Sequence, residues 1–399
     1  MDVRPGYKMT EVGVIPEDWE VSTLGETCAF ENGDRGKNYP STRSFAKDAL
    51  PFINAGHVAE GRIRLSELDY ISKEDFSLLG SGKFVPGDIL FCLRGSLGKF
   101  GVVGPDLGEG AIASSLVIVR PRSASLGREY LSCYFRSTHC TQMISKWSGG
   151  AAQPNLGAQD LACFAIPLPP TRAEQEAIAE ALSDADALIE SLEQLMAKKC
   201  RLKQGAMQEL LIGKRRLPGF SGEWVLKRLE EISHIKTGGR NNEDKIEEGE
   251  YPFFVRSATV ERINSYSYDC EAILIPGEGG IGSIFHYVRG RFDVHQRVYA
   301  ITQFTSETSG RFVYYYVAEK FGVHAMQNSV KATVDSLRLP TFQNFEIVMP
   351  PTAEEQTAIA ASLSDMDAEI AALEAKLAKA RSIKQGMMQE LLTGRIRLV

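Results

Sequence analysis

The chain of 399 residues contains one long segment twice. Residues 169–217 and 350–398 are identical at 29 of 49 positions, with a constant offset of 181 residues and no gap. This match is longer than a shared helical composition would produce, so it indicates an internal duplication. Each copy follows a longer and more divergent stretch. The order along the chain is therefore module, repeat, module, repeat.

Both copies of the repeat predict a long α-helix. Each follows a Pro-Pro pair and opens at a threonine, Thr171 or Thr352, with a glutamate three residues later, which is the pattern of a capping box. Each ends near a glycine, Gly213 or Gly394. The apolar positions recur at alternating steps of four and three, the spacing of a coiled-coil seam. The predicted seam is Ile178, Leu182, Ala185, Ile189, Leu192 and Met196 in the first copy, and Ile359, Leu363, Met366, Ile370, Leu373 and Leu377 in the second.

The simplest partner for each helix is the other helix, because both carry the apolar stripe in the same phase. Antiparallel pairing would relate the two halves of the chain by a pseudo-twofold axis. The alternative is that each helix packs only on its own module.

The two modules are also related, although more distantly. The corresponding segments are Trp19 and Leu24 with Trp224 and Leu229, Glu31–Arg35 with Lys236–Arg240, and Asp88–Val103 with Ala272–Val288. The last pair predicts a β-hairpin in each module, since an apolar run, a Gly-rich turn and a second apolar run follow one another. Tyr130–Ile144 and Arg311–Met326 predict one helix in each module, so the expected fold class is α+β.

The strings KQGMMQELLTG (Lys384–Gly394), KQGAMQELLIGKRRLPGF (Lys203–Phe220) and GVIPEDWEVSTLGE near the amino terminus resemble type I restriction-modification specificity subunits. The resemblance implies two target recognition domains, 1–168 and 218–348, each reading one half of a split DNA sequence. It also implies that the helical spacers, 169–217 and 349–399, form an antiparallel coiled coil that sets the spacing of the two half-sites.

The same resemblance implies the partners. They are double-stranded DNA, two modification subunits that methylate adenine with S-adenosylmethionine, and restriction subunits with motor and nuclease activity. The chain itself is expected to need no cofactor, because S-adenosylmethionine would bind the modification subunit. It is expected to act as a non-catalytic subunit of the methyltransferase and endonuclease complex.

The sequence contains no catalytic motif that would contradict this expectation. The sequence has no D/N-P-P-Y/F tetrapeptide of an adenine methyltransferase and no phosphate-binding loop of a DNA motor. Gly277, Gly279 and Gly282 match a dinucleotide-binding pattern, but the following residues are β-branched and aromatic and do not predict the required helix. The six histidines show no metal-binding spacing. We expect neither catalytic nor metal-binding residues.

Composition limits the location and the mode of binding. No apolar run approaches the length of a membrane span, and the amino terminus has no signal-peptide core, so a cytoplasmic protein is expected. The seven scattered cysteines predict free thiols. The net charge of −6 is unusual for a DNA-binding protein, because Lys and Arg normally neutralise phosphates. Affinity for DNA should therefore come from local patches or from a partner.

Candidate base-reading residues are Arg, Lys, Asn and Gln at predicted loops and turns, because these side chains recognise guanine and adenine in the major groove. In the first module they are Arg35, Lys37, Asn38, Arg43, Asn54, Arg94, Lys99, Gln153 and Asn155. In the second module they are Lys236, Arg240, Asn241, Asn242, Arg256, Gln296, Arg297 and Lys331.

Two other functions remain open at this point. A coiled-coil scaffold whose modules bind protein would suit the acidic charge. An enzyme has no motif in its favour.

Overall fold

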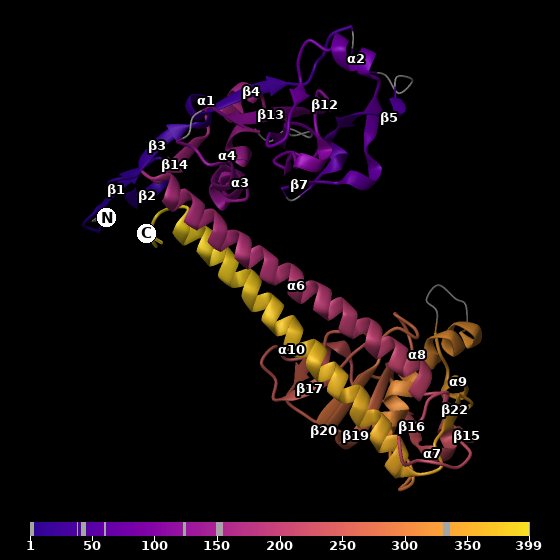
Figure 1. Cartoon of the computed structure of the whole chain (residues 1–399). Coiled ribbons are helices and arrows are strands. Elements are labelled where there is room, and N and C mark those ends of the chain that lie inside the picture. Colours follow the sequence, from indigo (N-terminus) through magenta and orange to yellow (C-terminus); the bar gives the residue numbers. More distant parts are fainter. Residues whose placement is uncertain are drawn as a thin grey trace. The chain divides into compact units, whose positions relative to one another are not determined.

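The computed structural model describes residues 4–37, 39–40, 45–59, 61–122, 125–148, 155–329 and 336–398, with the backbone alone for 45–49. The chain forms two compact units. Unit 1 consists of Met1–Ser191 and Leu377–Val399, and unit 2 consists of Leu192–Lys376. Figure 1 labels many of the helices and strands of both.

Unit 1 contains two four-stranded sheets. The first is antiparallel, in the order β11 (Phe100–Val102), β10 (Ile89–Cys92), β13 (Leu116–Pro121) and β4 (Cys28–Asn32). The second has the order β8 (Asp69–Ile71), β5 (Phe45–Ile53), β12 (Gly110–Ile112) and β9 (Lys83–Phe84), with β5 and β12 parallel. Ile89 lies opposite Val102, which confirms the predicted hairpin. All four residues of β10 are buried, since both faces of this strand are covered.

Short strand pairs and helices complete unit 1. The pairs are β1 (Tyr7–Thr10) with β2 (Gly13–Pro16), β3 (Glu20–Thr23) with β14 (Ala165–Leu168), and β6 (Val58–Ala59) with β7 (Arg62–Ile63). The helices are α1 (Leu24–Thr27), α2 (Lys73–Leu78), α3 (Arg128–Phe135), α4 (Thr138–Trp147) and α5 (Ala158–Ala162).

The prediction of one helix over Tyr130–Ile144 is wrong, because the segment forms two helices, α3 and α4. The first ends at Arg136, whose backbone N–H turns back to the carbonyls of Cys133 and Tyr134. Ser137 has extended backbone and caps the second helix, and its hydroxyl accepts from the Cys140 N–H at 3.1 Å. A serine in this conformation starts a new helix instead of continuing the old one.

Unit 2 is built on one six-stranded sheet. Its order is β16 (His234–Thr237), β21 (Val298–Thr302), β19 (Tyr268–Pro276), β20 (His286–Val294), β17 (Tyr251–Phe254) and β18 (Glu261–Ile263). Strands β17 and β20 are parallel and the other neighbours are antiparallel. Ala272 lies opposite Val288, which confirms the second hairpin. The Gly-rich turn after β19 leads into β20, so its glycines do not open a helix, as expected.

The remaining elements of unit 2 are β15 (Val225–Arg228) paired with β22 (Glu346–Met349), α7 (Leu229–Ile232), α8 (Gly310–Asn328) and α9 (Leu339–Gln343). Helix α8 confirms the prediction over Arg311–Met326.

Equivalent contacts in the two units confirm the duplication of the modules. The Leu24 N–H donates to the Phe164 carbonyl at 2.9 Å, and the Leu229 N–H donates to the Phe345 carbonyl at the same distance. Gly394 and Gly213, which end the repeats, have positive φ angles of 66° and 71°. A Cβ at either position would come within 3.1 Å of the indole of Trp19 or Trp224, so both glycines are needed where they stand.

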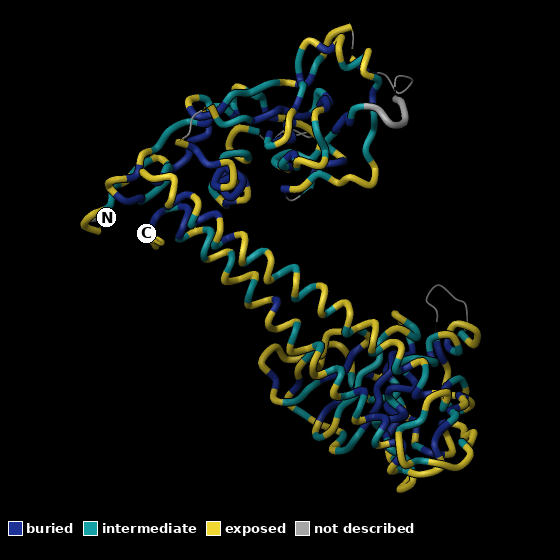
Figure 2. Tube along the Cα trace, in the orientation of Figure 1, coloured by how far each residue is buried: buried dark blue, intermediate teal, exposed yellow. Residues whose placement is uncertain are grey.

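The repeats form helices α6 (Arg172–Leu210) and α10 (Ala353–Leu391), each of 39 residues. Every predicted seam position is buried or half-buried, whereas Leu188 and Leu195, which lie off the stripe, are exposed. Figure 2 shows this alternation along both helices. The apolar periodicity was therefore sufficient to identify the inner face of each helix.

Ion pairs show the direction of the helices within each unit. In unit 1, Lys384 pairs with Asp186, and Arg397 pairs with Glu174 near the opposite ends of the two segments. In unit 2, Lys203 pairs with Asp367 at 2.5 Å and Arg216 pairs with Glu355. The two helical segments of each unit therefore run antiparallel, as predicted. They also pack on the sheets of the unit, since Ile178, Leu182 and Leu391 lie in one core of unit 1.

The capping-box prediction is correct only in part. The Thr171 and Thr352 hydroxyls accept from the backbone N–H groups of Glu174 and Glu355 at 3.2 and 3.4 Å. The two glutamate carboxylates do not complete the box, because they accept from Arg397 and Arg216 instead. The arginine pairs satisfy carboxylates that are almost fully buried.

Candidate nucleic-acid interface

A pocket in unit 2 gathers side chains from four separate loops. The loops follow strands β16, β17, β19 and β20, so the sheet fixes their spacing. The lining residues are Asn241, Asn242, Glu243, Arg256, Glu278, His295, Gln296 and Arg297. Five of the eight candidates predicted in the second module belong to this set, namely Asn241, Asn242, Arg256, Gln296 and Arg297.

The polar groups of this pocket hold one another in place. Glu278 lies between two guanidinium groups, with its Oε1 3.2 Å from Arg297 Nη1 and its Oε2 3.5 Å from Arg256 Nη1. Gln296 Nε2 donates to Asn241 Oδ1. The side chains of Arg256 and Arg297 are each at least half exposed, so their remaining N–H donors are accessible.

His295 lines the pocket and is almost fully buried. Burial, followed by the positive charges of Arg256 and Arg297, lowers the pKa of His295. Its Nδ1 accepts from the Arg297 N–H at 3.0 Å, which fits an unprotonated ring nitrogen. The imidazole thereby fixes the backbone of the loop that carries Gln296 and Arg297.

The other candidates of unit 2 lie outside the pocket. Arg240 donates from Nε to Asp293 at 2.9 Å, and because this carboxylate is buried the pair has a structural role. Lys236 is exposed on β16. Lys331 lies outside the described residues.

Among the described candidates of unit 1, the structure brings together Arg94 and Asn155. Arg94 follows β10, and its Nε donates to Asn155 Oδ1 at 2.9 Å. Arg35 donates to the Ser114 carbonyl at 3.3 Å, and Lys37 and Lys99 are exposed.

Asn54, another candidate of the first module, is engaged in contacts within unit 1. Asn54 caps a short 3-10 helix and donates to Asp69 at 3.1 Å, so its prediction as a base-reading residue is not supported by its contacts. Asn38, Arg43 and Gln153 lie outside the described residues.

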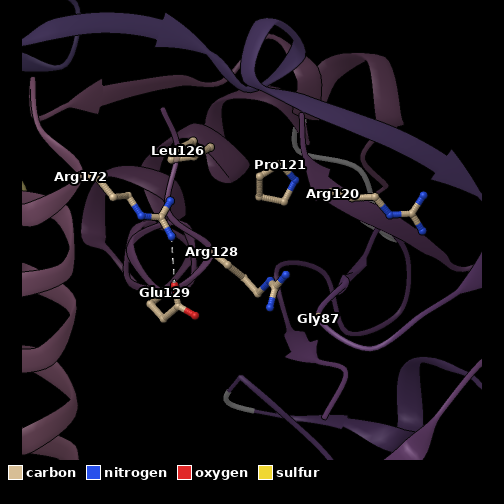
Figure 3. A pocket seen from close by; sticks show the side chains of 7 residues that line it. All are labelled: Gly87, Arg120, Pro121, Leu126, Arg128, Glu129 and Arg172. Atoms are coloured by element: carbon tan, nitrogen blue, oxygen red, sulfur yellow. Dashed lines mark ion pairs between the residues drawn. The ribbon is translucent and has the colours of Figure 1, made fainter. Parts of the chain in front are cut away.

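Unit 1 contains a second pocket, which the sequence did not predict. It is lined by Gly87, Arg120, Pro121, Leu126, Arg128, Glu129 and Arg172. Figure 3 shows the guanidinium of Arg172 directed at Glu129 and that of Arg128 near Gly87. Arg120 makes two hydrogen bonds to the buried Asp88, at 2.7 and 2.6 Å. Arg128 has no carboxylate partner among the residues that the structure describes, so it is the arginine best placed to meet an anion.

Residue type and position explain why the sequence did not predict four of the pocket residues. Glu243 and Glu278 are acidic, and Arg120 and Arg128 lie at the end of a strand and the start of a helix. The predicted base-reading residues were Arg, Lys, Asn and Gln at expected loops and turns. The alignment of the two hairpins could have identified Glu278, because this residue occupies the position in the second module that Arg94 occupies in the first.

The cysteine side chains bear out one further prediction from the sequence, that of free thiols. All seven cysteines are free, which confirms that prediction. Burial raises the pKa of the Cys92 and Cys140 thiols to about 12, so both remain protonated. Among the described residues, no group of His, Cys, Asp or Glu is arranged to hold a metal ion. The described helices include none that is long and apolar enough to cross a bilayer.

Known proteins resemble the chain along most of its length. A family model described as "Type I restriction modification DNA specificity domain" matches residues 16–198 and 221–381. A protein of Methanocaldococcus jannaschii named as the MjaX specificity subunit of a type I restriction enzyme is 25% identical over 430 aligned positions, covering 98% of this chain and 97% of that one. The StySPI specificity subunit of Salmonella potsdam is 24% identical over 394 positions, covering 86% and 81%.

Solved structures agree on the fold. The crystal structure of the S subunit of a type I restriction-modification system from M. genitalium matches with a TM-score of 0.66 and 15% identity, over 98% of each chain.

Proposed function

Because the chain belongs to the type I restriction-modification DNA specificity family, we propose that each of its two modules reads one half of a bipartite DNA site. The proposed recognition domains are 1–168 and 218–348, with 169–217 and 349–399 as helical spacers. The observation that carries this proposal is the unit 2 pocket, where five predicted base-reading side chains from three loops meet. A scaffold whose modules bind protein has no comparable support.

The proposed partners are two modification subunits, one for each copy of the repeat. Leu202 on α6 and Ile383 on α10 are equivalent positions, and their side chains are 53% and 51% exposed. An apolar side chain left in solvent at the same place in both copies favours one partner bound twice. The modules have diverged further than the repeats. The two copies of the repeat should therefore bind the same partner, whereas the two modules should read different DNA sequences.

The chain is proposed to contribute recognition, while the chemistry belongs to its partners. The modification subunits would bind S-adenosylmethionine and methylate adenine, and restriction subunits would join for cleavage. The complex would act in the cytoplasm. The net charge of −6 supports this division, since the chain lacks the excess of cations that tight binding to phosphates requires.

The proposal is tested by mixing the full chain with the cognate modification subunits and measuring complex mass, DNA binding and methylation. We expect two modification subunits per chain and a methylated motif of two separated half-sites. The variant pair Leu202→Asp and Ile383→Asp should reduce the bound modification subunits, whereas Glu248→Gln, an exposed change away from the helices, should not. A chain that binds its site with nanomolar affinity alone in physiological salt would contradict the proposed need for a partner.

A further inference from the structure

Glu278 is an acidic residue at the centre of a surface proposed to bind a polyanion. It follows β19 in the Gly-rich turn, and an isolated β-bridge between Glu278 and Ser336 holds it there. Its side chain is 24% exposed and lies within 3.5 Å of both Arg256 and Arg297. The carboxylate is therefore fixed in position and still reachable from solvent.

The charge of this pocket is unsuited to phosphate binding. Glu278 and Glu243 offset the two arginines Arg256 and Arg297, so the pocket lining carries no net positive charge. A carboxylate placed beside a DNA phosphate would be repelled, which would lower affinity for every sequence equally. A carboxylate that accepts hydrogen bonds, placed between two guanidinium donors, is suited instead to recognising base edges, because these present both donors and acceptors.

The equivalent position in unit 1 carries the opposite hydrogen-bonding character. Arg94 forms an isolated bridge with Asn155, as Glu278 does with Ser336. The neighbouring backbone hydrogen bonds also correspond. The Leu156 N–H donates to the Leu93 carbonyl at 3.0 Å, and the Leu337 N–H donates to the Gly277 carbonyl at 2.7 Å. The duplicated turn thus presents a donor in one unit and an acceptor in the other.

We propose that Glu278 determines sequence specificity in the second half-site by reading a G·C base pair together with Arg297. Glu278 accepts a hydrogen bond from the N4 amino group of cytosine, and Arg297 donates to O6 and N7 of guanine. These groups of the base pair lie side by side in the major groove, as the carboxylate and the guanidinium do in the pocket. The inference rests on the proposed function and adds the identity of the base pair.

The first test uses the wild-type complex and modified DNA. Each cytosine of the methylated motif is replaced in turn by N4-methylcytosine. Its methyl group takes the place of the N4 hydrogen that would form the hydrogen bond to Glu278. We expect binding to weaken by about 5- to 150-fold at one cytosine of the second half-site. The same replacement in the spacer between the half-sites is the control and should have little effect. Equal binding at every replaced position would overturn the inference.

The second test changes the protein. Glu278→Gln should lose discrimination at one G·C pair of the second half-site, as read from methylated motifs in sequenced DNA, and leave the first half-site unchanged. Glu248→Gln makes the same charge change on an exposed loop outside the pocket and should preserve the motif. A second half-site without a G·C pair would refute the role of Glu278 and leave the DNA-reading function intact. A wild-type complex without sequence preference would instead refute the proposed function.

Discussion

Arg216 donates from Nε and Nη2 to the two carboxylate oxygens of Glu355, whose side chain is only 1% exposed. The same arginine donates to the carbonyls of Ser221 and Gly222, at 2.9 and 2.6 Å. It therefore ties the chain that leaves α6 to the start of α10 within unit 2. Arg397 and Glu174 repeat this pair in unit 1, displaced by 181 residues.

Removing either arginine should destabilise its unit strongly. We expect Arg216→Ala and Arg397→Ala each to lower the free energy of unfolding by about 3 kcal/mol, because each leaves a buried carboxylate without its partner. Lys199→Ala is the control, since the Lys199–Glu369 pair is exposed and should contribute less than about 1 kcal/mol. The measurement is denaturant unfolding followed by far-ultraviolet circular dichroism. Equal effects of Arg216→Ala and Lys199→Ala would show that burial of Glu355 is unimportant.

The sequence predicted the long helices well because their signals are local. The apolar spacing identified the seam, and Thr171 and Thr352 do cap the helices. The hydrogen bonds that Glu174 and Glu355 accept from arginines could not be predicted, because these arginines lie 223 and 139 residues away along the chain.

The candidate site was predicted less completely, for two physical reasons. Residue type cannot distinguish Arg256, which is exposed in the pocket, from Arg240, which is held by a buried aspartate. The pocket also depends on four loops that only the sheet brings together, and Glu278 becomes informative only once its two arginine neighbours are known.

Arg128 offers a test of phosphate contact in unit 1. We expect Arg128→Ala to weaken binding of the complex to cognate and unrelated DNA by the same factor, because a phosphate contact carries no base information. The slope of log affinity against log salt concentration should become shallower by about one. Arg228→Ala, which removes an arginine already paired with Glu230 and Glu231, should change neither quantity. Loss of discrimination between sequences would instead place Arg128 against a base.

Exchange of one module should change one half-site. Replacing residues 1–168 by the first module of another family member is expected to alter the first half of the methylated motif and retain the second, because the unit 2 pocket is formed entirely within Leu192–Lys376. Sequencing of modified DNA gives the motif directly. A change in both halves would refute independent reading, and the reciprocal exchange of residues 218–348 provides the matched control.

The spacing between the half-sites can be tested through the helices. The chain leaves unit 1 for unit 2 after Ser191 in α6, and it returns to unit 1 after Lys376 in α10. Four residues inserted at both points would keep the two partners of pairs such as Lys384–Asp186 and Lys203–Asp367 within one unit. Four residues also restore the apolar phase approximately, whereas one or two would rotate the following residues off the stripe.

We expect the double four-residue insertion to lengthen the spacer of the methylated motif by one or two base pairs and to leave both half-sites unchanged. The inserted turn adds about 6 Å along each helix, and DNA advances about 3.4 Å per base pair. A four-residue insertion in α6 alone is the control, because it leaves the two helices unequal in length and should lower the yield of active complex. Double insertions of one or two residues should do the same by breaking the stripe. An active double variant with an unchanged spacer would show that these helices do not set the distance between the half-sites.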